Sequence, residues 1–372
     1  MKHEYGHRQL MALCFCASLA PAIRLMPRYS AGAAGRISWA APLLALPLLM
    51  VYALMLSAFL ARRHDGEGLG ELLLRTCGRG FGTAVLVITA LFELFCGGFI
   101  LRSGAERFIC TVYPAASPLL FAAVMLTLGL IAALGPRRAL MRSARIFAPI
   151  LCAVIVTVLI FMLPELDKKL LFPVGHVSWR GLLKAAVPML ELYAGMLAYT
   201  AVFRGGAAKD SRRGRREALR CVPVCLLFAL LTLCAVGAYG APMTARFSHP
   251  FFAMIRNVTI FRTIEHIEAL VVALWVLPDF AVFSLMLGGA AHLLRLVFGY
   301  KPRQDEGKLT DMKNGRFFIP VCAALTAAWA LFIDLHSQSL PEFSELYVPA
   351  ANMLVVLVLI PLCFVVCLAR GK

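Results

Sequence analysis

Arg262-Thr-Ile-Glu-His-Ile-Glu268 leads directly into Ala-Leu-Val-Val-Ala-Leu-Trp275, and this junction of charge with an apolar run decides the fold class. Glu265 and Glu268 are three residues apart, so they lie on one face of a helix. The apolar residues that follow begin a segment long enough to enter a lipid bilayer. Because a charge at the mouth of a membrane helix is costly unless it is solvated, paired or used, this helix end must meet a partner protein, a solute or water.

The composition extends the same conclusion to the whole chain. Hydrophobic residues make up 61% of the 372 residues, charged residues make up 15%, and the mean hydropathy is +0.81. That balance excludes an ordinary soluble domain and predicts an all-α integral membrane protein. A spanning helix needs about 20 mostly apolar residues. Ten candidate spans meet this condition: 9–28, 37–61, 81–103, 118–134, 143–163, 181–203, 219–241, 263–298, 316–333 and 346–369.

Two of these spans need a comment. The first lacks a small-residue cleavage site after a short apolar core, so we expect a retained helix rather than a signal peptide. The eighth, 263–298, is too long for one simple crossing, and we expect it to include an interfacial or tilted part.

The net charge of +17 comes from Lys and Arg residues that are concentrated in alternate loops, as is typical of membrane proteins. If the N-terminus is cytoplasmic, the inside segments carry more than twice as many Lys and Arg residues as the outside loops. This bias predicts an even number of spans with both termini cytoplasmic. The densest basic run, Arg212-Arg-Gly-Arg-Arg216, is most simply a topology anchor that touches anionic lipid. A nucleic-acid partner would require aromatic residues among the basic ones and a folded basic module, so we expect none.

The residues that usually carry catalysis or metals are dispersed. The 12 cysteines and 8 histidines form no metal-ligand set in sequence. Motifs of the HExxH, Walker and GxSxG kinds are missing from the sequence. We therefore expect no enzyme activity, no metal and no cofactor.

The spans divide into two halves of five, over residues 1–165 and 175–372. An odd number of spans per half inverts the second half, as in the inverted repeats of many secondary transporters, whose first and sixth helices are broken near the midplane. Breakers occur at matching places, with Pro21 and Pro27 in the first span and Pro188 and Gly195 in the sixth. The alternative is a pair of ordinary proline kinks, which membrane helices tolerate.

Short motifs along nearly the whole chain resemble one family. They are Gln9, Pro27 with Gly35-Arg-Ile-Ser-Trp39, Leu101-Arg102 with Glu106 and the Pro114/Pro118 segment, Ala144-Arg-Ile-Phe-Ala-Pro149, Leu171-Phe-Pro-Val174, and Pro250, Arg256 and Ile264-Glu-His-Ile-Glu268 with Trp275. In order and spacing they resemble the B subunits of the GerA-type spore germinant receptors, a branch of the amino acid–polyamine–organocation transporter superfamily. Three positions depart from the family pattern: Ala20-Pro21 replaces a common glycine, Arg24 an apolar residue and His266 an arginine.

The resemblance implies a LeuT-like bundle of ten helices. It also implies a membrane subunit that senses a small nutrient, typically an amino acid, beside an A-type subunit and a lipoprotein C-type subunit in the inner spore membrane. A broken helix suits such a ligand, because it offers a helix N-terminus to a carboxylate and free carbonyls to an ammonium group.

The candidate ligand-binding residues lie in or near the two presumed breaks and inside the third span. Arg24 is a counter-charge for a ligand carboxylate or an internal acid, unless the span ends early and the side chain reaches the outer interface. Glu191 is the candidate ammonium contact. Glu93, in Leu-Phe-Glu-Leu-Phe, must face the bundle interior or carry a proton. The predicted set is Ala20, Pro21, Arg24, Glu93, Glu191, Tyr193 and Gly195.

Other charged residues are predicted to be structural or partner-facing. Arg102 and Glu106 are spaced for an i,i+4 ion pair. Asp279, after Pro278, is a buried acid that needs a structural partner. Glu265 and Glu268 lie at the outer end of the eighth span, away from a midplane pocket, so we expect them to pair with Arg262 or to face a partner subunit.

Three function classes remain from the sequence. The first is a receptor subunit that binds a nutrient and signals to its partners. The second is a secondary transporter that moves an amino acid. The third is a membrane scaffold with a vestigial pocket, which the replaced glycine near Pro21 would fit.

Overall fold

The computed structural model of the chain describes residues 16, 26–64, 67–111, 117–172, 175, 177–202, 212–257, 267–299, 317–335 and 343–370. All regular structure in these ranges is helical. Seven elements are long single helices: α2 (Ala41–Leu60), α4 (Arg79–Thr111), α5 (Pro118–Leu134), α6 (Arg137–Met162), α10 (Arg212–Tyr239), α13 (Ile267–Val297) and α14 (Phe318–Leu335).

Two predicted spans are helices of mixed type. The sixth runs through α8 (Trp179–Ala186), the 3-10 turn η3 (Val187–Leu190) and α9 (Glu191–Val202). The tenth runs through the π-helix η5 (Phe343–Tyr347), α16 (Val348–Asn352), the π-helix η6 (Met353–Leu359) and α17 (Ile360–Ala369). The short connecting elements are η1 (Gly35–Ala40), α3 (Leu69–Cys77), η2 (Leu163–Glu165), α7 (Lys168–Leu171), α11 (Ala241–Arg246) and α12 (Pro250–Asn257).

The described helices agree with the predicted membrane spans. Eight are long and apolar enough to cross a bilayer, and the shorter apolar helix α5 coincides with the predicted span 118–134. The predicted first span, 9–28, lies outside the described residues except at Cys16 and from Met26 onward, so the count of ten stays a prediction. The predicted boundary between the halves, 165–175, falls in the connection made by η2 and α7.

Within the described residues, most of the long predicted segment 263–298 is one helix, so the expected interfacial or tilted part stays a prediction. The single helix α13 covers 267–297, and α12 precedes it as a short helix that packs against it. Residues 258–266, which include Glu265, lie outside the described part.

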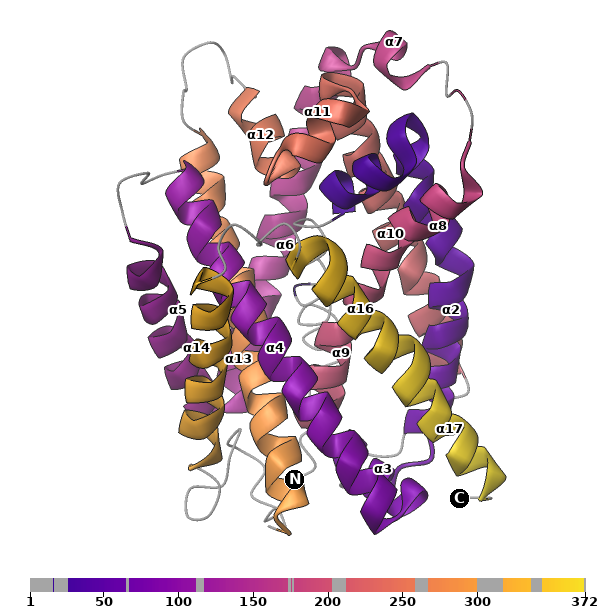
Figure 1. The fold of residues 1–372 in the computed structure, drawn as a ribbon, viewed down its shortest axis with the longest axis vertical. Coiled ribbons are helices and arrows are strands. Elements are labelled where there is room, and N and C mark those ends of the chain that lie inside the picture. The colour runs from indigo at the N-terminus through magenta and orange to yellow at the C-terminus, as the bar shows by residue number, and fades with distance from the viewer. Residues whose placement is uncertain are drawn as a thin grey trace.

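The bundle is built around α4 and α13. These two helices pack along each other, α14 and α5 pack beside both, and α9 packs on α13 (Figure 1). Of the residues in their most apolar windows, 78% are buried for α13 and 72% for α4, against 28% for α6. Exposed side chains such as Leu120 and Ile131 on α5 and Ile146 and Ile160 on α6 form the apolar outer surface that a bilayer covers.

Glycines let the central helices approach closely. A Cβ added to Gly98 of α4 would lie 2.8 Å from Trp329 Cβ in α14, and one added to Gly97 would lie 3.3 Å from Thr326 Cγ2. A Cβ on Gly129 of α5 would collide with the ring of Phe283 in α13. Small residues at such contacts permit the van der Waals packing that holds membrane helices together.

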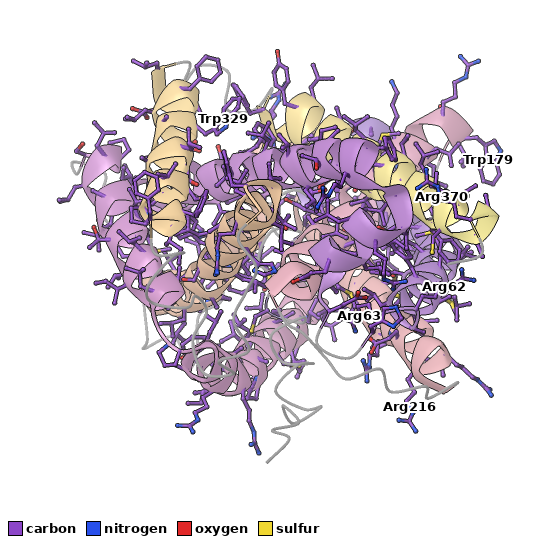
Figure 2. The ribbon with its side chains drawn as sticks, turned by 90° about the horizontal axis from the view of Figure 1, so that it is seen from below. Arg62, Arg63, Trp179, Arg216, Trp329 and Arg370 are labelled. Carbon is purple, nitrogen blue, oxygen red and sulfur yellow. The ribbon has the colours of Figure 1, made fainter. Side chains whose placement is uncertain are left out.

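The two ends of the bundle differ in character. The short helices α7, α11 and α12 lie at one end, and α3 with the end of α17 lies at the other (Figure 1). Figure 2 views this second end, where Arg62, Arg63, Arg216 and Arg370 gather around the ends of α2, α10 and α17. Arg370 Nη1 donates to the Thr76 carbonyl of α3 at 3.0 Å, which ties the C-terminal helix to this basic end.

Candidate functional site

Among the described residues, Glu93 is the acidic side chain that the fold buries most completely. It lies on α4 with 0% of its surface exposed, and neither carboxyl oxygen has a hydrogen-bond partner among the described residues. Its Oε2 occupies the space that a side chain at Gly289 of α13 would fill, and a Cβ there would also lie 3.3 Å from the Ala198 Cα of α9. Cys322 of α14 is within electrostatic range. The carboxyl group therefore lies where four helices meet.

Glu191 begins α9, directly after the 3-10 turn at Pro188. The predicted break of the sixth span is thus a tightened turn in a helix that continues on both sides. The side chain of Glu191 is 4% exposed. A carboxylate in the first turn of a helix is favoured by the helix dipole, so this buried acid has a local electrostatic reason for its place.

The turn at Pro188 faces the interrupted part of the tenth span. The segment η3 packs against both α16 and η6, at the junction where the α-helix changes to a π-helix. Asn352 closes α16 at this junction, is 1% exposed, and its Oδ1 has no hydrogen-bond partner in the described part of the chain. Insertions of π-helix often mark functional positions. The sequence interpretation missed Asn352, although a lone amide in the apolar run 348–369 is a detectable signal.

Tyr193 and Gly195, two residues of the predicted ligand set, both lie on α9. The Tyr193 hydroxyl donates to the Leu49 carbonyl of α2 at 2.6 Å, and its ring lies 4.3 Å from that of Tyr52. Tyr193 is therefore committed to the contact of α9 with α2. Gly195 is buried within α9.

Asp279 has a structural partner in the fold, and that partner is Arg107. The two side chains form an ion pair between α13 and α4, each 1% exposed. The Arg107 guanidinium also lies 5.3 Å from the ring centroid of Phe252 in α12, within range of a cation–π interaction. Phe252 in turn packs against Trp275 of α13, with 5.8 Å between the rings. This cluster joins three elements at the end of the bundle where α12 lies.

Arg102 forms a different ion pair from the predicted one. Its Nε lies 2.7 Å from Asp334 Oδ1 at the end of α14, so the pair joins two helices and not two turns of α4. Arg102 also lies within electrostatic range of Glu106, so the i,i+4 interaction stays a prediction beside the Asp334 pair. The remaining predicted residues Ala20, Pro21, Arg24 and Glu265 lie outside the described residues, as does the side chain of Glu268.

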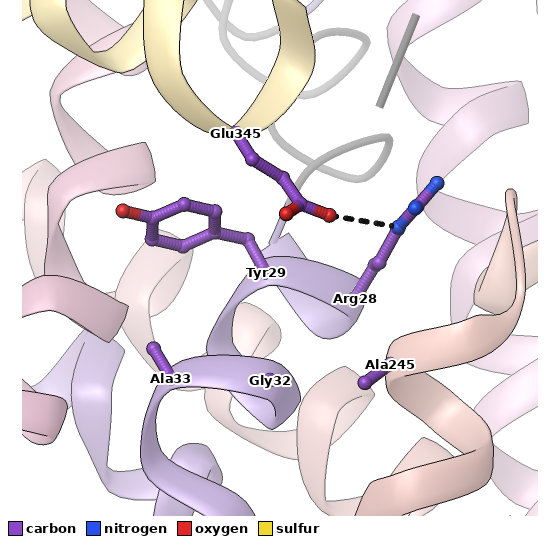
Figure 3. Close-up of a pocket in the computed structure, with 6 residues that line it drawn as sticks. All are labelled: Arg28, Tyr29, Gly32, Ala33, Ala245 and Glu345. Carbon is purple, nitrogen blue, oxygen red and sulfur yellow. Dashed lines mark ion pairs between the residues drawn. The ribbon is translucent and has the colours of Figure 1, made fainter. Parts of the chain in front are cut away.

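A small cavity opens between the start of the described chain and the tenth span. It has a volume of about 290 Å³ and is lined by Arg28, Tyr29, Gly32, Ala33, Ala245 and Glu345 (Figure 3). Arg28 Nε lies 3.2 Å from Glu345 Oε1, with 18% and 45% of the two side chains exposed. The cavity thus presents one positive and one negative group close together, on segments that are far apart in sequence.

The comparisons with known proteins give a family and a fold. The sequence matches the model of a family described as spore germination protein over residues 6–334. One similar solved structure is a Na⁺-coupled sialic acid symporter in a substrate-bound outward-open state, with a TM-score of 0.61 and 14% identity, covering 94% of this chain and 79% of the symporter. None of the curated proteins matches the sequence.

A second similar structure is Mhp1, a nucleobase-cation-symport-1 family transporter in a closed conformation with bromovinylhydantoin bound. Its TM-score is 0.58 at 14% identity, and the match covers 90% of this chain and 75% of Mhp1. Likeness at this identity shows a common fold, which is the LeuT-like fold of transporters, and leaves the substrate open. The family and the fold together indicate a membrane permease-like protein rather than an enzyme.

Proposed function

Because the chain belongs to the spore germination protein family, we propose that it is the membrane subunit of a germinant receptor. In this proposal it binds a small nutrient, of the amino-acid class, and passes the resulting change of conformation to an A-type subunit and a lipoprotein C-type subunit. The observation that carries the proposal is the combination of a germination family with a transporter fold. A permease fold supplies a binding site within the membrane, and germination supplies a reason to sense a nutrient.

The geometry supports an amino acid as the ligand class. An amino acid carries a carboxylate and an ammonium group at neutral pH, and each needs an opposite charge or dipole when it leaves water. Glu191 is our candidate for the ammonium contact, since it directly follows the 3-10 turn η3, which packs against the tenth span. The cavity of Arg28 and Glu345 offers both charges near the end of the bundle formed by α11 and α12.

We place the protein in the inner spore membrane, with both termini cytoplasmic. The basic end of the bundle supports this orientation, because Arg62, Arg63 and Arg370 lie at the ends of α2 and α17 (Figure 2). The opposite end, with the short helices α11 and α12, then faces away from the cytoplasm.

Thermal stabilisation by single amino acids tests nutrient binding. The purified full-length protein is screened against the amino acids, and at least one is expected to raise the unfolding temperature, since a ligand at 100 times its Kd stabilises the native state by about 2.7 kcal/mol. The Glu191→Ala variant is expected to lose that shift. Glu165→Ala, which removes an exposed acid of η2, is the matched control and should retain it. Stabilisation of wild type by none of the amino acids would overturn the proposal.

The alternative is a secondary transporter of the same superfamily, and it rests on the likeness to two coupled transporters. Uptake of labelled amino acid into proteoliposomes separates the two functions. A receptor subunit is expected to bind the amino acid without filling the vesicles, whereas concentrative uptake would favour the transporter. Co-purification of the protein with A-type and C-type subunits tests the partners directly.

A further inference from the structure

Glu93 differs from the buried residues Asp279 and Arg102, because each of those two has an ion-pair partner. The buried acid Asp279 faces Arg107, and the buried base Arg102 faces Asp334. Glu93 is more deeply buried than Asp334, yet both its oxygens lack a hydrogen-bond partner within the described residues. An ionised carboxylate without a partner is strongly destabilised in an apolar interior, so such a group is normally neutral.

The surroundings of Glu93 leave little to satisfy a charge. The described residues at the contact of Glu93 with Gly289 include Ala198, and Cys322 is in electrostatic range; none of these three residues carries a side-chain oxygen. A bound metal cation needs several oxygen ligands around it. A proton needs only the carboxyl oxygen itself. Among the described residues, the packing therefore favours a proton as the species that neutralises this site.

Within the described part of the chain, the titratable groups on the helices packed against α4 do not supply a counter-charge next to the carboxyl. On α3, which also packs against α4, Arg75 pairs with Glu67. On α14 the near group is Cys322. On α13 the closest in sequence to Gly289 is His292, whose Nε2 lies 3.5 Å from Glu71 Oε1 of α3. On α9 the acid Glu191 is seven residues from Ala198, about two turns away. The helix α5 contains no titratable residue.

We propose that Glu93 is a proton-binding site of this protein. In the packed arrangement of α4 and α13 the side chain is a neutral carboxylic acid. When the two helices separate enough to admit water, the O–H bond breaks, the proton passes to a water molecule as H₃O⁺, and the carboxylate becomes solvated. Proton affinity and the α4–α13 contact are thereby linked, since each state of the contact has its own affinity for the proton.

This site extends the proposed function without depending on it. A receptor or a transporter whose central helices move would release and rebind a proton at Glu93 in each cycle. The test uses no nutrient, so failure of nutrient binding and failure of proton binding are separate results.

Infrared spectroscopy of the full-length protein in lipid nanodiscs detects the proton directly. A protonated carboxylic acid has a C=O stretching band that a carboxylate and an amide lack. We expect wild type at neutral pH to show one such band that is lost in Glu93→Gln and retained in Glu165→Gln, whose acid is exposed. The absence of the band in wild type, or its persistence in Glu93→Gln, would overturn the proposal.

A second variant guards against misfolding. Glu93→Asp keeps the carboxyl but shortens the side chain, so it should keep a protonated band at a shifted frequency. Titration of the thermal unfolding temperature provides the matching energetic readout: wild type is expected to lose stability as the pH is raised, and Glu93→Gln is expected to lack that loss. Identical pH profiles for wild type and Glu93→Gln would also overturn the proposal.

Discussion

Replacing Asp279 by asparagine tests how α4, α12 and α13 are held together. Asp279 and Arg107 are each 1% exposed, so the pair is fully removed from water. Arginine stays protonated in proteins, and asparagine cannot neutralise it. Removing one partner of a buried ion pair costs about 3–5 kcal/mol, because a buried charge is left uncompensated. The contact of Arg107 with Phe252 at 5.3 Å lowers this cost only in part.

The matched control is Asp334→Asn, which removes the carboxylate from the other α4 ion pair. Arg102 is 10% exposed and Asp334 is 25% exposed, so this pair is less completely removed from water, and the expected loss is smaller than that of Asp279→Asn. Unfolding is followed in nanodiscs by tryptophan fluorescence, because Trp275 packs on Phe252 next to the pair. Equal losses for Asp279→Asn and Asp334→Asn would refute the argument from burial.

A double replacement separates packing from charge. Changing Arg107→Met together with Asp279→Leu removes both charges while filling similar space. Buried ion pairs replaced in this way are often neutral or stabilised, so the double variant is expected to be much more stable than Asp279→Asn. A double variant less stable than the single one would show that the ion pair itself is required.

Three further replacements probe the packing and the cavity. Gly289→Ala should destabilise the protein by about 1–3 kcal/mol through overpacking against Glu93. Part of that loss should disappear when the same change is made in a Glu93→Ala variant. An unchanged loss in that variant would contradict the contact between residue 289 and Glu93. Tyr193→Phe removes a hydrogen bond to the Leu49 carbonyl and should cost about 0.5–1.5 kcal/mol with nutrient affinity unchanged, whereas lost affinity at full stability would place this hydroxyl in the ligand site. Glu345→Gln should change the unfolding free energy by less than about 1 kcal/mol, because the side chain is 45% exposed, and a larger loss would make its ion pair structural.

The spans were predictable because hydropathy is a local property of the sequence. The predicted segment 118–134 coincides with α5, and 346–369 differs from the tenth span only at its start. The helix breakers were also visible, since Pro188 lies in the 3-10 turn of the sixth span. What proline alone did not reveal is that the helix tightens there and continues.

The side-chain partners were not predictable because they depend on how neighbouring helices are aligned. Glu106 is one turn from Arg102, but the close approach of α4 to α14 at Gly98 brings Asp334 within 2.7 Å of it. In the same way, the burial of Glu93 could be predicted from its apolar neighbours in sequence. The contact of its carboxyl group with Gly289 could not, because it depends on how α4 packs against α13. Sequence spacing along one helix carries no information about either contact.

Equilibrium binding of a labelled amino acid to the purified protein tests the central claim most directly. The ligand is the amino acid that gives the largest thermal stabilisation, and the variants are Glu191→Ala and the control Glu165→Ala. A charged hydrogen bond contributes about 1.5–3 kcal/mol, so Glu191→Ala is predicted to raise the Kd roughly 10- to 150-fold, while the control binds as wild type does. Wild-type protein that binds no amino acid, or a Glu191→Ala variant that binds equally well, would contradict the account.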